Sequence, residues 1–174
     1  MSPKAKSLSE EEISTLVSLL SSLEPGFLPF DIFIQIARLV ALPIIEFVPL
    51  RVNANGQVEV LLIDREVWPY ALHTPGTVVR ATDTEGRHVV FERIREELQG
   101  TKISDPHYVG STLHKSQRGT EQAQIFWVEL LGEPTVGQLH VVDDLPVRTM
   151  DSQIEFIKQA AKSFMDFKSV TIEH

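Results

Sequence analysis

The sequence contains no cysteine, and this absence excludes several kinds of chemistry. Disulfide bonds, thiolate catalysis and cysteine-ligated zinc or iron–sulfur sites cannot form. Runs of basic residues are missing too, and 16 lysine and arginine side chains face 24 aspartates and glutamates, giving a formal net charge of −8. We therefore expect no polymeric nucleic acid as a partner, because binding a phosphate backbone requires a basic surface.

Long hydrophobic segments are also missing. The most apolar stretch, residues 40–50, is interrupted by Pro43, Glu46 and Pro49, and it is far shorter than the ~20 residues needed to span a bilayer. The N-terminus has no apolar core of the kind found in secretory signals. We predict a cytoplasmic protein that does not interact with membranes. If its substrate is anionic, a few basic side chains or a divalent cation must supply positive charge locally.

The 174 residues, 43% of them hydrophobic, are enough for a folded core. Ser9 and Glu12 form a capping-box pattern that predicts a first helix, and a second amphipathic helix is predicted after Pro29. We predict that residues 1–42 are an N-terminal two-helix extension. Its apolar side chains could cap the chain's own domain or pair two chains into a homodimer. The side chains concerned are Leu16, Leu20, Phe30 and Phe33.

Residues 43–174 are predicted to form a single domain. Two strands, at 44–52 and 58–63, flank an Asn-Gly pair typical of a hairpin. Val90, Ile94 and Leu98 recur at four-residue steps, which predicts the buried face of a helix. Further strands are predicted at 77–79, 107–113, 123–130 and 137–142, before a helix that carries residues 154–165. This order predicts an α+β fold with a mixed β-sheet sandwiched between helices.

The segment from Pro75 to Gly100 carries a chemical signal. It reads PGTVVRATDTEGRHVVFERIREELQG and resembles a degenerate Nudix box. The family pattern places Gly, five residues, Glu, seven residues and Arg-Glu-apolar-x-Glu-Glu-x-Gly-apolar on a strand, loop and helix. Residues 68–76 are similar to the family's Trp-x-x-Pro-Gly-Gly approach, and residues 139–146 to its late strand and acidic-Leu-Pro turn. The ordered resemblance covers residues 44–167 and implies a Nudix-like domain.

The resemblance also implies an activity. Nudix hydrolases cleave a nucleoside diphosphate linked to another moiety, and Mg²⁺ or Mn²⁺ held by helix carboxylates neutralises the diphosphate and activates water. The expected partner is therefore a small nucleotide-like substrate. The alternative is a catalytically inactive Nudix-fold protein that binds a nucleotide-like ligand or a protein partner, because the box departs from the pattern at Thr77 and at the Arg-Glu pair.

Three registers of the box are possible, because the stretch from Gly76 to Gly100 is longer than the pattern. Anchoring on Arg93 and Gly100 puts Glu85 at the first Glu and leaves only Glu97 at a metal-binding position. The other two registers use different anchors and select different carboxylates.

Anchoring on Gly76 instead puts Asp83 at the first Glu, with Glu92 and Glu96 at ligand positions. The third register takes the buried face of the helix as its guide and assigns the Glu pair to Glu96 and Glu97. We prefer this third register on physical grounds, since it keeps the apolar stripe in the core. A solvated helix face laced by ion pairs is the simpler alternative.

The preferred register yields a set of candidate site residues. The predicted metal ligands are Glu92, Glu96 and Glu97. Catalytic roles are predicted for Glu96 and Glu97, for Arg93 as the partner that orients them, and for Glu129 as a base or extra ligand. Four residues near the box or in the long loop are predicted to bind substrate: His73, Gly76, His114 and Arg118.

Overall fold

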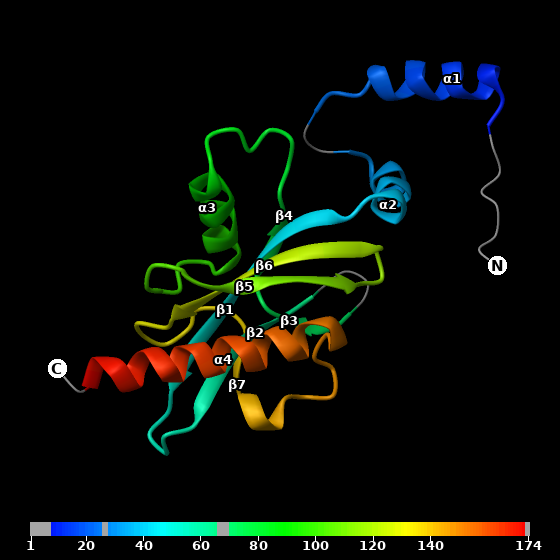
Figure 1. Ribbon diagram of the computed structural model, residues 1–174. Helices are drawn as coiled ribbons and strands as arrows, with labels where there is room; N and C mark the ends of the chain where they lie inside the picture. The colour runs from blue at the N-terminus through cyan, green and yellow to red at the C-terminus, as the bar shows by residue number, and fades with distance from the viewer. Residues whose placement is uncertain (1–7, 26–27, 66–69, 173–174) are drawn as a thin grey trace.

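A computed structural model describes residues 8–25, 28–65 and 70–172 (Figure 1). Trp68, which belongs to the predicted approach to the box, lies outside these ranges. The elements in chain order are α1 (Glu10–Ser21), α2 (Phe30–Leu39), β1 (Leu42–Val52), β2 (Val58–Asp64), β3 (Leu72–His73), β4 (Gly76–Val78), α3 (Arg87–Glu97), β5 (His107–Lys115), β6 (Thr120–Glu129), β7 (Gln138–Val141), the 3-10 helix η1 (Val142–Asp144) and α4 (Asp151–Ile172).

Strand β1 is the centre of a mixed, seven-stranded sheet: five strands have the order β3-β2-β1-β6-β5, β4 also pairs with β1, and β7 also pairs with β2. From Leu42 to Leu50 β1 pairs with β6 in parallel. On its other edge β1 changes partner: its first half pairs with β4, with Glu46 opposite Gly76, and its second half pairs with β2, with Leu50 opposite Val60. The edge of β1 is therefore divided between two strands just after Glu46.

Helices cover both faces of this sheet, as Figure 1 shows for α3 and α4. Alternate residues of β1 face opposite sides, so Val48 joins the core under α4 with Phe164, and Phe47 joins the core under α3 with Ile94. Being covered on both sides explains why β1 is almost continuously apolar. The predicted α+β fold with a mixed sheet between helices is confirmed.

The two N-terminal helices differ in how they pack. The predicted capping box of α1 forms, with the Ser9 amide 2.8 Å from Glu12 Oε2 and the Glu12 amide 3.2 Å from Ser9 Oγ. No residue of α1 is buried, and α1 stands away from the sheet in Figure 1. Helix α2 instead places Ala37 in the core under α4, with Phe33 packed against it. The division of the chain at residue 42 stays a prediction.

Helices in the described part of the chain are too short or too polar to cross a bilayer.

Two short elements were not predicted, because β3 and η1 have only 2 and 3 residues and offer no periodicity. The predicted core stripe of α3 is confirmed, since Val90, Ile94 and Leu98 are all buried.

Candidate functional site

A pocket of about 720 Å³ lies where β1 changes partner from β4 to β2. We call it the main pocket. Its size falls within the range of small-molecule sites. Side chains from several elements line it, among them Glu46, Arg65, His73, Glu97, Arg118 and Glu121. Charged and polar groups of both signs therefore converge on one cavity.

Gly76 lies between two carboxylates of the main pocket. Its amide donates a hydrogen bond to Glu97 Oε2 at 3.1 Å. A Cβ at this position would lie 2.4 Å from Glu46 Oε2 and 2.6 Å from Glu46 Cδ. Glycine is thus required by the close approach of the Glu46 side chain across the β1–β4 pair. The structure places this predicted substrate-binding residue in the pocket lining.

Glu46 is a buried carboxyl group in the middle of the apolar strand β1. Its residue is 6% exposed, and Oε2 accepts hydrogen bonds from Thr74 Oγ1 at 3.0 Å and Gln153 Nε2 at 3.2 Å. Burial, which disfavours the charged form, raises its pKa to about 8. At neutral pH Glu46 is therefore mainly protonated. Sequence reasoning missed this residue, although a lone acidic residue within a buried strand was an available signal.

His73 and Glu97 face each other across the main pocket. His73 Nδ1 lies 2.8 Å from the Thr74 carbonyl oxygen, which can only accept, so Nδ1 carries a hydrogen. Burial lowers the pKa of His73 and raises that of Glu97. In the neutral imidazole Nε2 keeps its lone pair, and it lies 3.8 Å from Glu97 Oε1. Both residues, predicted from the sequence, line the pocket.

A second buried carboxylate, Glu121, contacts His114 and Arg118, two of the residues predicted to bind substrate. Glu121 Oε1 accepts from Arg118 Nε at 2.7 Å and from Ser116 Oγ at 2.8 Å. His114 Nε2 lies 3.3 Å from Glu121 Oε2. His114 and Arg118 thus both reach the main pocket, as lining residues. Because Arg118 is paired with Glu121, most of its charge is balanced within the protein.

Arg65 is the other arginine of the main pocket, and the carboxyl groups of Glu97, Glu121 and Glu46 act on it only through longer-range charge. Its residue is half-buried, and its guanidinium has no hydrogen-bond or ion-pair partner among the described residues. Burial lowers its pKa, and the nearby positive charge of Arg118 acts in the same direction. A guanidinium held in this way would be stabilised by an incoming anion. Sequence reasoning missed Arg65, which belongs to no motif.

Arg93 holds an acidic loop residue instead of a pocket carboxylate. Its Nη1 and Nη2 donate to the two carboxylate oxygens of Asp83, each at 2.8 Å, and Nη2 also reaches the Val78 carbonyl at 3.1 Å. The Arg93 guanidinium lowers the pKa of Asp83 to about 2. The pair joins the loop after β4 to α3. The two residues of this pair belong to different registers of the box. Asp83 is the first acidic residue of the register anchored on Gly76, and Arg93 is an anchor of the register that ends at Gly100.

Three other predicted site residues lie outside the main pocket lining. Glu92 and Glu96 are exposed on α3, and Glu92 pairs with Arg95 on the same helix. Glu129 is at the end of β6 remote from Glu121, and its carboxylate lies 2.5 Å from Lys168 Nζ on α4. Of the carboxylates predicted as ligands, the structure brings only Glu97 into the pocket.

These positions bear on the predicted Mg²⁺ or Mn²⁺. Among residues 8–25, 28–65 and 70–172, no group of three or more histidine, aspartate and glutamate side chains is placed to hold a metal ion. Within the pocket, Glu46 is mainly protonated and Glu121 is occupied by Arg118. Asp64, which also lines the pocket, is paired with Arg148. The remaining donors, Glu97, His73 and His114, include one carboxylate, fewer than the set of carboxylates expected for a Nudix metal site. The donor set of the pocket does not fit that site.

The chain is similar in structure to Nudix proteins. It matches NrtR from Shewanella oneidensis with 15% identity and a TM-score of 0.56, over 72% of this chain and 64% of NrtR. It matches the NUDIX domain of the same protein, solved with ADP ribose, with 15% identity and a TM-score of 0.54, over 85% of this chain and 97% of that domain. It matches an Ap4A hydrolase from C. elegans with 14% identity and a TM-score of 0.56, over 72% of this chain and 99% of the hydrolase.

The sequence itself matches no protein-family model and no curated protein. The chain spans just under two thirds of NrtR but nearly all of the NUDIX domain and of the hydrolase. Identities this low establish the fold alone. The Nudix fold expected from residues 44–167 is therefore present.

Proposed function

We propose that the main pocket binds a nucleotide-like ligand through its phosphates, namely a nucleoside diphosphate linked to another moiety. The observation that carries this proposal is Arg65, a half-buried guanidinium with no partner among the described residues. Phosphate oxygens are the natural acceptors for such a group. The NUDIX domain of NrtR, solved with ADP ribose, supports this ligand class.

The pocket also suits an uncharged or partly charged ligand group beside the phosphates. Protonated Glu46 can donate a hydrogen bond, while neutral His73 offers an accepting Nε2. Neither group adds a full negative charge that would repel phosphate. Binding of the ligand through these groups does not require a metal ion held by three carboxylates. The described residues place no such group of side chains together.

Metal-dependent hydrolysis of the same ligand is the second candidate function. It is favoured by Glu97, the carboxylate of α3 that reaches the pocket in the segment resembling a degenerate Nudix box. The C. elegans neighbour is an Ap4A hydrolase. Because the protein side chains of the pocket do not make up the family's metal site, this candidate requires the ligand's own phosphates to complete the coordination of Mg²⁺ or Mn²⁺. Location in the cytoplasm stays a prediction.

A panel of ligands separates the two candidates. Nucleotide sugars, dinucleotide polyphosphates, ADP-ribose and nucleoside triphosphates are titrated against the protein with Mg²⁺, with Mn²⁺ and with chelator, and phosphate-containing products are measured in parallel. We expect saturable binding of at least one compound in chelator. Turnover that requires metal would establish the second candidate, and a folded protein that binds nothing in the panel would contradict both.

Two neighbouring glutamates of α3 offer a matched test of hydrolysis. If turnover is found, Glu97→Gln should reduce it at least ~100-fold, as loss of a charged group that acts on the transition state does. Glu96→Gln should leave turnover unchanged, because Glu96 is exposed and outside the pocket lining. An equal loss of turnover in the two variants would support the third register of the box, in which Glu96 and Glu97 are both metal ligands.

A further inference from the structure

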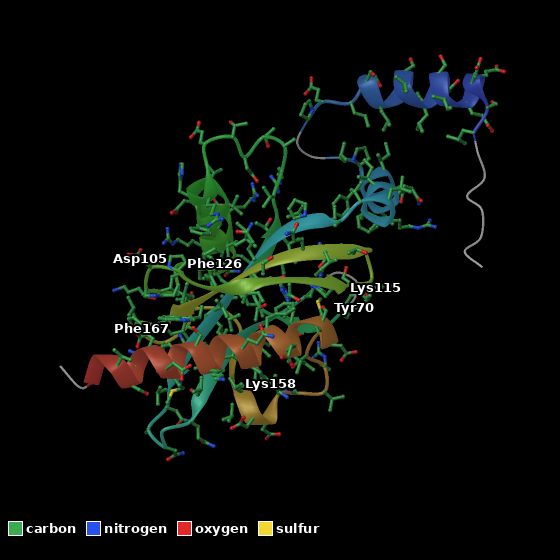
Figure 2. All side chains as sticks on the ribbon, in the orientation of Figure 1. Tyr70, Asp105, Lys115, Phe126, Lys158 and Phe167 are labelled. Carbon is green, nitrogen blue, oxygen red and sulfur yellow. The ribbon has the colours of Figure 1, made fainter. Side chains whose placement is uncertain are left out.

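Gln153, in the first turn of α4, has a side-chain amide whose orientation is set by the backbone. Its Oε1 accepts a hydrogen bond from the Thr74 amide at 2.8 Å. The Nε2 group therefore faces Glu46, and it donates to Glu46 Oε2 at 3.2 Å. Figure 2 shows that α4 begins at the same end of the sheet as Tyr70, which precedes β3. Helix α4 thus brings a fixed donor to the buried carboxyl group.

Thr74 supplies a second donor to the same oxygen of Glu46. Thr74 is fully buried, and its Oγ1 lies 3.0 Å from Glu46 Oε2. This hydroxyl has no other partner among the described residues, so its hydrogen finds an acceptor only if Thr74 donates to Oε2. Oε2 therefore accepts two hydrogen bonds and leaves no free direction for a hydrogen of its own. When Glu46 is protonated, the hydrogen is on Oε1.

Oε1 is the oxygen of Glu46 that a ligand in the main pocket can reach. Both hydrogen bonds from the described residues end on Oε2. Oε1 is also not one of the unpartnered side-chain atoms that are sealed from solvent in this part of the chain. Because Glu46 lines the main pocket, its protonated carboxyl group presents an O–H donor to that pocket.

Glu46 carries this hydrogen at neutral pH. Burial raises its pKa to about 8, the charge of Glu121 on β6 acts in the same direction, and the charge of Arg118, in the loop between β5 and β6, opposes it. The hydrogen-bond partners of Glu46 among the described residues are both uncharged. The other titratable groups that line the main pocket are Asp64, Arg65, His73, Glu97 and His114.

We propose that Glu46 selects the ligand by donating a hydrogen bond from Oε1 to an uncharged acceptor atom, such as that of a hydroxyl, a carbonyl or a ring nitrogen, and that loss of this hydrogen weakens binding. Thr74 and Gln153 are positioning residues, because they keep the hydrogen on the pocket side. The acceptor is uncharged because Glu121 and Glu97 line the same pocket. This inference rests on the proposed function and deepens it.

The first test is calorimetric titration of ADP-ribose, in chelator, into the full chain from about pH 7 to about pH 9.5. ADP-ribose has no group that titrates in this range, so a change in affinity comes from the protein. We expect the affinity to fall above pH 8, approaching ~10-fold for each pH unit, because only protonated Glu46 donates. Glu46→Gln should bind with an affinity independent of pH, and Glu11→Gln, exposed on α1, should keep the wild-type profile.

Glu46→Met separates donation of a hydrogen bond from the mere lack of charge. The amide of Glu46→Gln accepts from Thr74 and Gln153 with its oxygen and turns its N–H donors to the pocket, whereas methionine cannot donate. At neutral pH, Glu46→Met should bind ADP-ribose at least ~10-fold more weakly than Glu46→Gln. Denaturant unfolding shows whether Glu46→Met is folded, and the pH profile of the wild type decides if it is not.

Infrared difference spectra of the wild type minus Glu46→Gln locate the hydrogen without any ligand. The C=O stretching band of a protonated carboxyl group should be present at about pH 7 and absent at about pH 9.5. Gln153→Met removes one donor to Oε2, so the band should move to higher frequency. Gln159→Met, an exposed change on the same helix, should leave the band in place.

Three results overturn this inference while the proposed function stands. They are a wild-type affinity that stays constant across the pH range, equal affinities of the folded Glu46→Gln and Glu46→Met variants, and a carboxyl band that is absent at neutral pH or does not move in Gln153→Met. Failure of ADP-ribose to bind the folded wild type at every pH overturns the two together.

Discussion

At Gly76 a glycine is required by space and not by backbone torsion. The nearest atoms to a Cβ at this position belong to the buried Glu46 carboxyl, which is held by Thr74 and Gln153. The side chain of Glu46 cannot move away without breaking those hydrogen bonds. The same glycine supplies the amide that holds Glu97. One residue therefore fixes the positions of two carboxyl groups in the main pocket.

Gly76→Ala should lower the free energy of unfolding by roughly 1–3 kcal/mol, the usual cost of overpacking a tightly packed site. Denaturant unfolding measures this loss. Gly132→Ala is the control, because a Cβ there meets nothing within 4 Å. Equal stability of the two variants would show that Glu46 does not approach Gly76 as described.

Glu46 gives the protein a specific dependence of stability on pH. The folded state keeps its proton up to about pH 8, whereas the unfolded chain releases it near the ordinary value of 4.5. The folded state binds more protons in this window, so stability should fall as the pH rises, by about 1.4 kcal/mol for each pH unit. Glu46→Gln should remove this slope, since an amide oxygen still accepts from Thr74 and Gln153.

Unfolding curves recorded at intervals across this pH window for the wild type and Glu46→Gln test the prediction. Glu11→Gln is the control, because Glu11 is exposed on α1. Parallel pH profiles for wild type and Glu46→Gln would mean that Glu46 is ionised in the folded protein.

Individual site residues were predicted unevenly from the sequence. Gly76 and Glu97 belong to the segment that resembles the box and His73 to the approach before it, so a motif could find them. Glu46 and Arg65 belong to no motif, and their roles depend on burial and on the lack of a partner. Those properties arise from packing in three dimensions and are not visible in the order of residues.

At the scale of elements, the ion pair between Asp83 and Arg93 joins the loop between β4 and α3 to the helix. The Asp83 side chain is almost fully buried and that of Arg93 is largely so. The low pKa of Asp83 means that the pair stabilises the fold above pH ~4, and that this contribution is lost as the pH falls through about 2.

Asp83→Asn should therefore lower the free energy of unfolding at neutral pH by about 2–3 kcal/mol, because Arg93 would keep a largely buried charge without its partner. Thermal or denaturant unfolding measures the effect. Glu85→Gln, an exposed change in the same loop, should have no measurable effect. If Asp83→Asn and Glu85→Gln were equally stable, the Asp83–Arg93 ion pair would not stabilise this loop.

Periodicity predicted α3 well but did not predict which of its acidic residues face the pocket. The apolar stripe follows from four-residue spacing, and all of it is buried. Glu97 flanks that stripe, whereas Glu96 points away from it, and the resemblance to the box selected both. The packing of α3 against β4, where the Gly76 amide contacts Glu97, places Glu97 in the pocket. Local spacing cannot specify such a contact between elements.

At the scale of the whole molecule, the N-terminal helices should contribute unequally to stability. Removing residues 1–25 should change the free energy of unfolding by no more than ~0.5 kcal/mol, since α1 buries no residue. Removing residues 1–40 should cost several times more, because Ala37 and Phe33 leave the core. Equal losses from the two truncations would mean that α1 packs on the domain.

Light scattering on the full chain and on residues 26–174 tests the predicted homodimer. Leu16 and Leu20 are exposed on α1, so a dimer formed through them should dissociate when α1 is removed. A monomer in both cases would reject the dimer.

In the proposed function, the main pocket binds a nucleotide-like ligand through Arg65. The most direct measurement is calorimetric titration of ADP-ribose, in chelator, into the wild-type protein, Arg65→Gln and Arg87→Gln, the last being an exposed control. We predict saturable binding to the wild type and to Arg87→Gln. Binding to Arg65→Gln should be at least ~10-fold weaker, as expected for loss of charge-assisted hydrogen bonds. No saturable binding to the folded wild type, or equal affinities for the two variants, would contradict this role of Arg65.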